Sequence, residues 1–252
     1  MHACYLAVVA LAALALPADS LPSAVYHAPA APGAATTQLL TGSTLDLAAL
    51  EVTTATLAPG QASRPRPTGA EELLIVAQGQ LTATLADTTR TLGAGGVLLA
   101  MAGTAPALRN ASAAPARYWT LKFTAVAGAD ARRGQAGGGS RLLAWPGFRV
   151  IKTDKGETRP VFDRPSSMFP RFDVHATVLK AGLASHPPHT HRAEEIVLLT
   201  QGQGQIQIND QTYPAAAGDV ILLRANVPHA FTNTSRAPVS YFAIQWHSQA
   251  GE

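Results

Sequence analysis

Four side chains in the C-terminal half of this 252-residue chain have the types and the spacing of metal ligands. His189 and His191 are two residues apart, so they project from the same face of an extended segment, and Glu195 reaches that face if the strand continues. His229 follows 34 residues after Glu195, on a later strand expected to return beside the first. Three imidazoles and one carboxylate are costly to bury without partners, and one divalent cation satisfies all four.

Neighbouring residues leave alternatives open. His186 is three residues before His189, so we expect it to face elsewhere, whereas His175 lies on an adjacent expected strand that could point it into the barrel. A hydrogen-bonded core histidine is the expected role of each, and a place at the site is the alternative. Glu194 should point away as well, because alternate residues of a strand face opposite sides. The competing interpretation is that "HPPHTH" is a surface loop that binds nothing or binds zinc adventitiously, and the matching His229 disfavours it.

The elements that must position these residues occur twice. Residues 69–110 align with 192–233 without a gap at a constant offset of 123, and residues 117–123 match 240–246 at the same offset. The chain therefore consists of two copies of one domain. At the positions of the four candidate ligands, the first copy has Arg66, Thr68, Glu72 and Pro106.

Only one candidate ligand is retained in the first copy, so we expect that copy not to hold the metal. Its expected role is structural, supporting the second copy or forming a dimer face. The alternative is that Arg66 pairs with Glu72 and grips an acid.

Each copy is composed of short segments rich in β-branched and aromatic residues, separated by turn residues, and no segment has a sustained helical period. Such a pattern is typical of an antiparallel barrel or sandwich, and the fold class we predict is all-β, with two barrels in tandem. The expected organisation is a signal peptide at 1–18, an N-terminal barrel at 25–125, a flexible linker at 126–141 and a metal-binding barrel at 142–248.

The first 18 residues form an apolar segment of signal-peptide length, followed by small residues. They include Cys4, the chain's only cysteine, so a chain cleaved after Ala18 has no thiol. We expect an exported protein, periplasmic or secreted, whose mature form has no membrane segment.

Charge excludes one class of partner. The formal net charge is +3 and no run of Lys and Arg is dense, so the pI of about 9.2 does not indicate nucleic-acid binding. The partner we expect is a small-molecule substrate or ligand, and a homo-oligomer is compatible with the sequence.

Two motifs resemble those of the cupin family, G-x5-H-x-H-x3,4-E-x6-G and G-x5-P-x-G-x2-H-x3-N. The first is matched from Gly182 through the histidines and Glu195 to Gly202, with an opening gap of six residues rather than five. The second is matched from Gly218 to His229 and Asn233, with Arg224 and Asn226 in place of Pro and Gly. The repeat makes the chain similar to a bicupin, which implies two jelly-roll barrels, also called double-stranded β-helices.

Within bicupins, the C-terminal half is most similar to (S)-ureidoglycine aminohydrolase and its relatives, through "FDVHATVLKAG", "YPAAAGDVI" and "VPH". Those enzymes have Glu, His, His and Gln at the positions of the four candidate ligands, and a substrate-binding lysine at the position of Gln245. The ligand set here is instead the general cupin one, so the architecture is expected to carry over and the substrate to differ.

The resemblance implies a metal-dependent enzyme that acts on a small polar, oxygen-rich metabolite, of hydrolase, isomerase or dioxygenase type. Nitrogen and oxygen ligands without a thiolate admit several ions, of which we expect Mn first and Fe, Ni, Zn or Cu as alternatives. Tyr241 matches a substrate-facing tyrosine of the aminohydrolases and is the candidate catalytic residue; its alternative role is a wall residue. The other hypothesis for the whole chain is a non-catalytic module that binds a small ligand or a metal.

Overall fold

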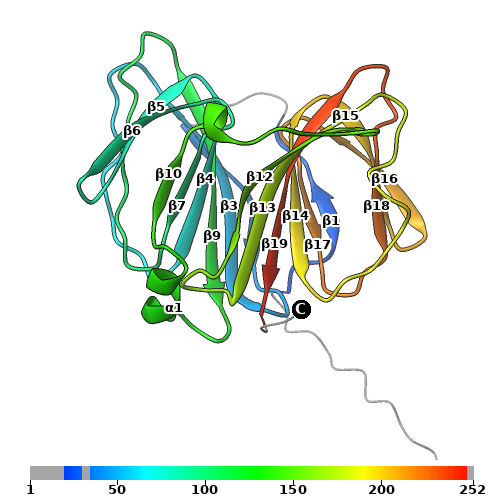
Figure 1. The fold of residues 1–252 in the computed structure, drawn as a ribbon, viewed down its shortest axis with the longest axis horizontal. Coiled ribbons are helices and arrows are strands. Elements are labelled where there is room, and N and C mark those ends of the chain that lie inside the picture. The colour runs from blue at the N-terminus through cyan, green and yellow to red at the C-terminus, as the bar shows by residue number, and fades with distance from the viewer. Residues whose placement is uncertain (1–19, 30–34, 249–252) are drawn as a thin grey trace, which may run out of the picture.

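The structure is a computed structural model that describes residues 20–29 and 35–248. The predicted signal peptide lies outside these residues. Figure 1 shows two barrels side by side, built almost entirely of strands. The expected all-β class with two tandem barrels is therefore confirmed. No helix in the described part of the chain has the length and apolarity needed to cross a membrane.

The N-terminal barrel has a six-stranded and a three-stranded antiparallel sheet. The order is β10-β7-β4-β9-β3-β2 in the large sheet and β6-β5-β8 in the small sheet. The bounds are β2 Thr36–Gly42, β3 Leu47–Leu57, β4 Glu71–Gln78, β5 Gln80–Leu85, β6 Thr88–Gly93, β7 Val97–Ala100, β8 Ala107–Arg109, β9 Ala116–Ala125 and β10 Arg141–Leu143.

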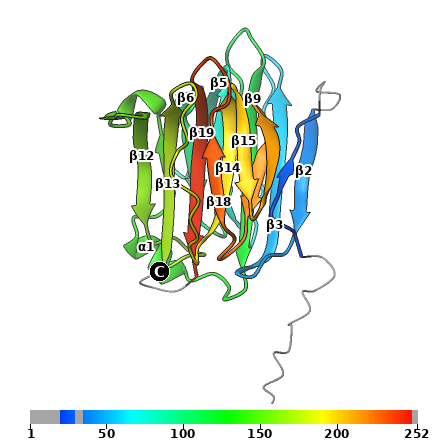
Figure 2. The ribbon, with the colours of Figure 1, turned by 90° about the vertical axis from the view of Figure 1, so that its right-hand side faces the viewer.

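The C-terminal barrel has the same plan. Its large sheet has the order β1-β17-β14-β19-β13-β12-β11 and its small sheet the order β16-β15-β18. The bounds are β1 Ala24–Tyr26, β11 Ile151–Thr153, β12 Gly156–Arg164, β13 Arg171–Leu179, β14 Glu194–Gln201, β15 Gln203–Ile208, β16 Gln211–Ala216, β17 Val220–Leu223, β18 His229–Thr232 and β19 Val239–His247. Figure 2 shows this barrel toward the viewer, with its strands running roughly along one direction.

The two large sheets lie back to back in the middle of the molecule, and the small sheets lie on the outside (Figure 1). The core between the large sheets draws residues from both copies, and each barrel also has an apolar core of its own. Phe123 and Trp246 are repeat mates that meet at the centre of the shared core, with ring centroids 5.5 Å apart. Because the central strands are buried on both faces, β14 and β17 are continuous apolar runs rather than alternating ones.

The two copies exchange their first strands. β1 precedes the first copy but pairs with β17 of the C-terminal barrel, with Ala24 opposite Leu222. β10 begins the second copy but pairs with β7 of the N-terminal barrel, with Arg141 opposite Leu99. The barrel boundaries in space therefore differ from the boundaries expected along the chain.

The segment expected to be a flexible linker has structure. It contains helix α1 (Ala131–Ala136), whose first turn is capped by the Asp130 side chain accepting from the Arg133 backbone N–H. Arg133 in turn donates to the backbone oxygens of Ser166 and Ser167 in the C-terminal copy. A 3₁₀ turn, η1 (Trp145–Gly147), then leads into the second barrel.

Candidate metal centre

The segment before β14 carries two of the four predicted ligands. His189 and His191 lie just outside the strand, and His189 pairs with the first residue of β18 through two backbone hydrogen bonds to His229, of 3.2 and 3.0 Å. This isolated bridge places the three histidines together, although they come from opposite ends of the repeat.

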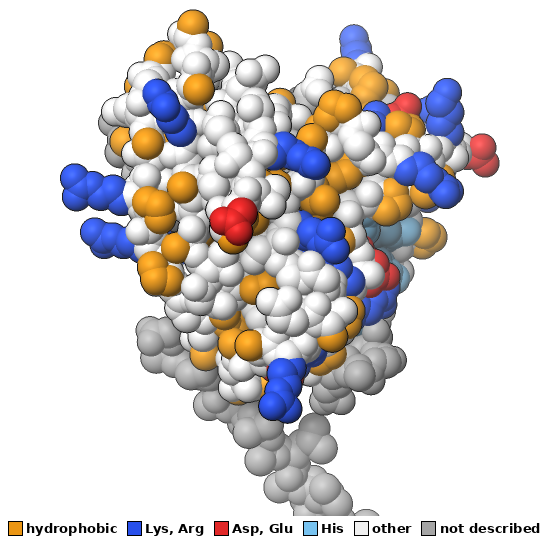
Figure 3. Space-filling view, turned by 60° about the vertical axis from the view of Figure 1, so that its left-hand side comes forward, with side chains coloured by type: hydrophobic (Ala, Val, Ile, Leu, Met, Phe, Trp, Pro, Cys, Tyr) orange, Lys and Arg blue, Asp and Glu red, His pale blue; other side chains and the backbone are white. Residues whose placement is uncertain are grey.

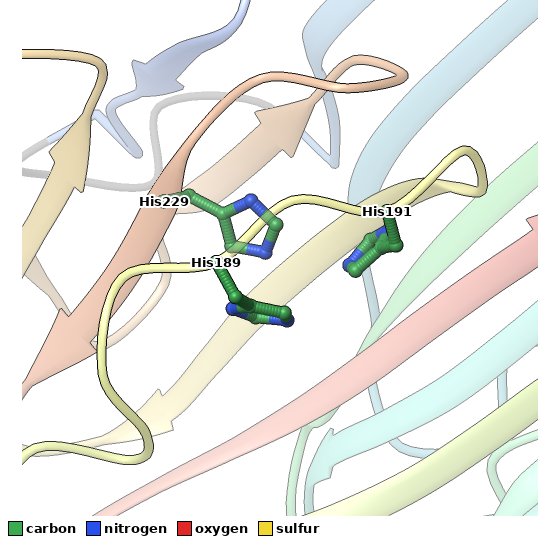
Figure 4. Close-up of side chains that lie close together, drawn as sticks. All are labelled: His189, His191 and His229. Atoms are coloured by element: carbon green, nitrogen blue, oxygen red, sulfur yellow. The ribbon is translucent and has the colours of Figure 1, made fainter.

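The three imidazoles point toward one another (Figure 4). One nitrogen from each ring lies within 4.8 Å of the other two. Metal–nitrogen bonds of about 2.1 Å hold two ligands no more than about 4 Å apart, so a small contraction closes the cluster around one ion. Figure 3 shows histidine side chains at the surface at the right of the view, beside acidic and basic side chains. His189 is exposed, His191 is half-buried and His229 is buried, so the cluster is open to solvent on one side.

The backbone sets the tautomers of two of these histidines. Nδ1 of His191 lies 2.8 Å from the backbone oxygen of Ala193, and Nδ1 of His229 lies 2.8 Å from that of Val227. Each carbonyl can only accept, so Nδ1 donates, and in the neutral ring Nε2 then has a lone pair for a metal ion; in the protonated ring it donates instead, as toward Glu195. Nε2 of His229 is buried without a hydrogen-bond partner. A buried acceptor of this kind fits a metal ion, which would supply its partner.

Glu195 lies at the side of this cluster. Its Oε2 is 3.2 Å from Nε2 of His191 and 3.7 Å from Nε2 of His229, and Gln245 on β19 donates to it at 3.0 Å. Burial raises the pKa of Glu195, but the neighbouring His191 and His229 outweigh burial and hold the pKa well below its usual range. The carboxylate is therefore charged and available as an oxygen ligand. The structure brings the four predicted ligands together. Gln245 orients the Glu195 carboxylate, a role that the sequence did not indicate.

Asn226 explains how the second motif works without its usual glycine. It has a left-handed backbone with φ of 60°, which asparagine tolerates better than most residues. Its N–H donates to the backbone oxygen of His191 at 2.8 Å. The turn after β17 thereby holds the segment that carries His191.

A cavity of about 240 Å³ opens beside the histidines. Its lining mixes apolar side chains of the barrel core with polar ones: His175, Ser185, His186, His189, Glu195, His229, Tyr241 and Gln245. This volume and polarity suit a small polar molecule.

His186, expected to face elsewhere, and His175 both line this cavity. The ring of His186 packs edge-on against that of His189 with centroids 3.9 Å apart, because the two prolines between them turn the segment back on itself. His175 shares the inward face of β13 with Asp173, and its Nδ1 lies 3.4 Å from Asp173 Oδ1. Burial lowers the pKa of His175, but Asp173, with the more distant charges of Glu195 and Asp163, outweighs burial and leaves the pKa raised. Glu194 does point away from the cavity, as expected.

Tyr241 is in the cavity wall and belongs to the apolar core of the barrel. Burial raises the pKa of its hydroxyl to about 12, against hydrogen bonds with Thr177 and Ser185 that lower it. Tyr241 is thus a neutral hydrogen-bond donor or acceptor near pH 7. Both of its expected roles, in chemistry or in the wall, stay predictions.

In the N-terminal barrel, the position that matches Gln245 is occupied by a lysine, Lys122. Lys122 on β9 lies opposite Glu72 on β4 and Glu51 on β3, and its Nζ is 3.9 Å from Glu51 Oε1. Burial raises the pKa of Glu72, and Lys122 opposes that shift. Arg66 is exposed, and no ion pair joins it to Glu72, both being described residues. The cation beside Glu72 is therefore Lys122, the repeat mate of Gln245. It is not Arg66, the partner in the alternative interpretation of the sequence.

Comparison with known proteins agrees with this geometry. The family model of the cupin domain matches residues 176–245, which span β13 to β19 and contain all four predicted ligands. Over 84 residues, a third of the chain, the sequence is 33% identical to mannose-1-phosphate guanylyltransferase of Klebsiella pneumoniae, and the match spans only 18% of that enzyme.

Solved structures extend the likeness to both cupin barrels. A putative glyoxylate-induced protein of Pseudomonas aeruginosa superposes with a TM-score of 0.69 at 18% identity, over 86% of this chain and 82% of that one. Oxalate decarboxylase of Bacillus subtilis, a structure described for its Mn(II) centres, gives a TM-score of 0.63 at 12% identity, over 82% and 71%. At these identities the likeness shows the fold, which is that of a bicupin.

Proposed function

We propose that the chain is a metal-dependent bicupin enzyme that acts on a small, oxygen-rich metabolite, with one divalent ion in the C-terminal barrel. The observation that carries this proposal is the convergence of three imidazoles and the charged Glu195 at the mouth of a polar cavity, with Nε2 of His229 buried and unpaired. His189, His191, His229 and Glu195 would hold the ion. When bound, it supplies a positive centre that polarises a substrate oxygen.

The residues around the cavity divide the remaining work. Tyr241 is neutral near pH 7 and is assigned to donate a hydrogen bond to a substrate oxygen. His175, whose raised pKa depends on Asp173, is assigned to hold or transfer a proton. Gln245 keeps Glu195 turned toward the histidines.

Mn is the ion we favour, because the ligand set contains no thiolate and a bicupin of similar fold is described with Mn(II) centres. The similarity to (S)-ureidoglycine aminohydrolase supports the architecture rather than the substrate, since the ligand set and Gln245 depart from that enzyme's pattern. An exported location and a small-molecule partner belong to the same proposal. The sequence is compatible with a homo-oligomer.

Elemental analysis of the purified full chain tests the metal. We expect about one divalent ion per chain, lost in His191→Ala and kept in His175→Gln, which changes a cavity residue outside the ligand set. Absence of metal in the unaltered protein after growth with Mn, Fe, Ni, Zn and Cu supplied would overturn the proposal.

A second experiment separates the enzyme from the binding module. Metal-loaded protein is assayed against ureides, keto acids, uronates and dicarboxylates, following both binding and turnover. Turnover that His175→Gln lowers while metal content stays unchanged supports the enzyme. Binding of such a compound with no turnover favours the non-catalytic module.

A further inference from the structure

The segment that carries His191 and Glu195 is attached to the other barrel. Its residues alternate in direction, so Arg192 and Glu194 face away from the histidine cluster, whereas His191 and Glu195 face each other within it. Both outward residues contact one turn of the N-terminal barrel, Thr44–Leu45–Asp46, just before β3. The ligand segment is therefore held from behind by a domain that carries none of the predicted ligands.

These contacts are dense and buried. Glu194 is fully buried, and Oε2 accepts from the Thr44 hydroxyl at 2.5 Å, the Asp46 N–H at 3.2 Å and Trp246 Nε1 at 3.2 Å. Arg192 makes a two-pronged ion pair with Asp46, each nitrogen–oxygen distance being 2.8 Å. The Asp46 side chain is only 6% exposed, so solvent screens this pair poorly.

The repeat shows which of these contacts accompanies the metal site. The metal-free copy keeps the glutamate: Glu71, the mate of Glu194, accepts from the Ser167 hydroxyl at 2.6 Å and the Met168 N–H at 3.1 Å across the same interface. It lacks the ion pair, because Gly69 is the mate of Arg192 and Met168 occupies the place of Asp46. The glutamate anchor is thus common to both barrels, and the Arg192–Asp46 pair belongs to the barrel with the histidines.

We propose that Asp46, in the N-terminal barrel, is a positioning residue for the metal centre of the C-terminal barrel and acts through Arg192. This inference rests on the proposed function. By fixing Arg192, Asp46 restricts the backbone of the adjacent His191, whose ring must meet His229 and Glu195 on one ion. Without the pair, the segment samples more conformations, and ordering it on binding costs affinity.

The experiment measures metal affinity, which needs no substrate. Mn(II) and Zn(II) dissociation constants are determined by chelator competition for the full chain, Asp46→Asn and Arg192→Gln, together with the midpoint of thermal unfolding. Residues that orient metal ligands typically contribute about 10- to 100-fold to affinity, so we expect a loss of about tenfold in each variant. The double variant should lose no more than either single one, because both remove the same pair.

Ser167→Ala is the control, since it weakens the glutamate anchor of the metal-free barrel in the same interface and leaves the Arg192–Asp46 pair untouched. It should lower the unfolding midpoint and leave the dissociation constants unchanged. If Asp46→Asn does not fold, Arg192→Gln, whose side chain is 30% exposed, tests the same contact from the other barrel.

The outcomes separate the two proposals. If the unaltered chain binds no divalent ion, the proposed function fails. If it binds an ion and the Asp46 and Arg192 variants bind it as tightly as Ser167→Ala does, Asp46 is structural only and this inference is wrong. A tenfold loss confined to Asp46→Asn and Arg192→Gln supports it.

Discussion

Glu71 and Glu194 are repeat mates in the same interface, and we expect their conversion to glutamine to have very different costs. Both side chains are fully buried. Glu194 accepts four hydrogen bonds, three on Oε2 and one on Oε1 from the Leu45 N–H at 3.3 Å. Glu71 accepts from Ser167 and Met168 on Oε2, while its Oε1 is buried without a partner.

In Glu194→Gln, the amide oxygen can keep the three hydrogen bonds that Oε2 accepts. The NH₂ group then replaces Oε1 and faces the Leu45 N–H, so two donors meet and neither has an acceptor. Leaving buried donors unpaired costs about 1–3 kcal/mol, and bonds to a neutral oxygen are weaker than bonds to a carboxylate. The expected loss is about 3 kcal/mol. In Glu71→Gln the NH₂ group replaces an oxygen that has no partner, so the expected loss is under about 1 kcal/mol.

Urea unfolding of the chelator-treated proteins at pH 7, followed by tryptophan fluorescence and circular dichroism, gives the free energy of unfolding for each variant. Coincidence of the two signals checks that one transition is measured. Equal losses in the two variants, or a larger loss for Glu71→Gln, would refute the hydrogen-bond reasoning.

Three further outcomes are expected. Burial raises the pKa of Glu71 above its ordinary 4.5, so the contribution of Glu71 to folding is fully present below pH 4.5 and is lost as the pH rises through the raised pKa. Any loss of stability in Glu71→Gln relative to the unaltered chain should therefore become smaller as the pH rises from 4.5, measured by urea unfolding; a loss that grows with pH would contradict the raised pKa. Tyr241→Phe should keep its metal, and an ultraviolet titration of the variant should lack one tyrosine that ionises near pH 12 in the unaltered chain. Loss of a tyrosine with a lower titration midpoint would contradict the burial of Tyr241. Gly95→Ala should lower the unfolding midpoint by several degrees, because Gly95 has a φ of 77° and an added Cβ would lie 2.4 Å from the Trp145 ring; an unchanged midpoint would show that the ring moves aside freely.

Much of the fold could be predicted because the repeat is gapless over the central strands. Short strands predicted in one copy are therefore predicted at the same offset in the other. The exchange of β1 and β10 could not be predicted, since each is a three-residue strand outside the aligned region and its partner lies in the other copy. The helix at Ala131–Ala136 was missed because its stability comes from a cap and from contacts with the second copy, not from helical periodicity.

The candidate site shows a similar division. Spacing along one strand predicted that His191 and Glu195 share a face, and the structure agrees. The direction of His186 depends on a turn through Pro187 and Pro188, which strand alternation does not describe. The alternative pairing of Glu72 with Arg66 rested on the positions that match the metal ligands, and those positions do not indicate Lys122, which approaches Glu72 across the sheet.

The strand exchange also constrains how the molecule reaches its final form. Ala24 is synthesised long before its partner Leu222, which belongs to the second copy, so the edge of the C-terminal large sheet is completed only after β17 has left the ribosome. Until then β1 has no partner strand, and its unpaired backbone is a template for another chain's strand. A fragment that starts at residue 142 lacks β1, leaves one edge of β17 unpaired and should self-associate. Contacts this distant in sequence also slow folding, so the barrel with the histidines is expected to be the later of the two to close.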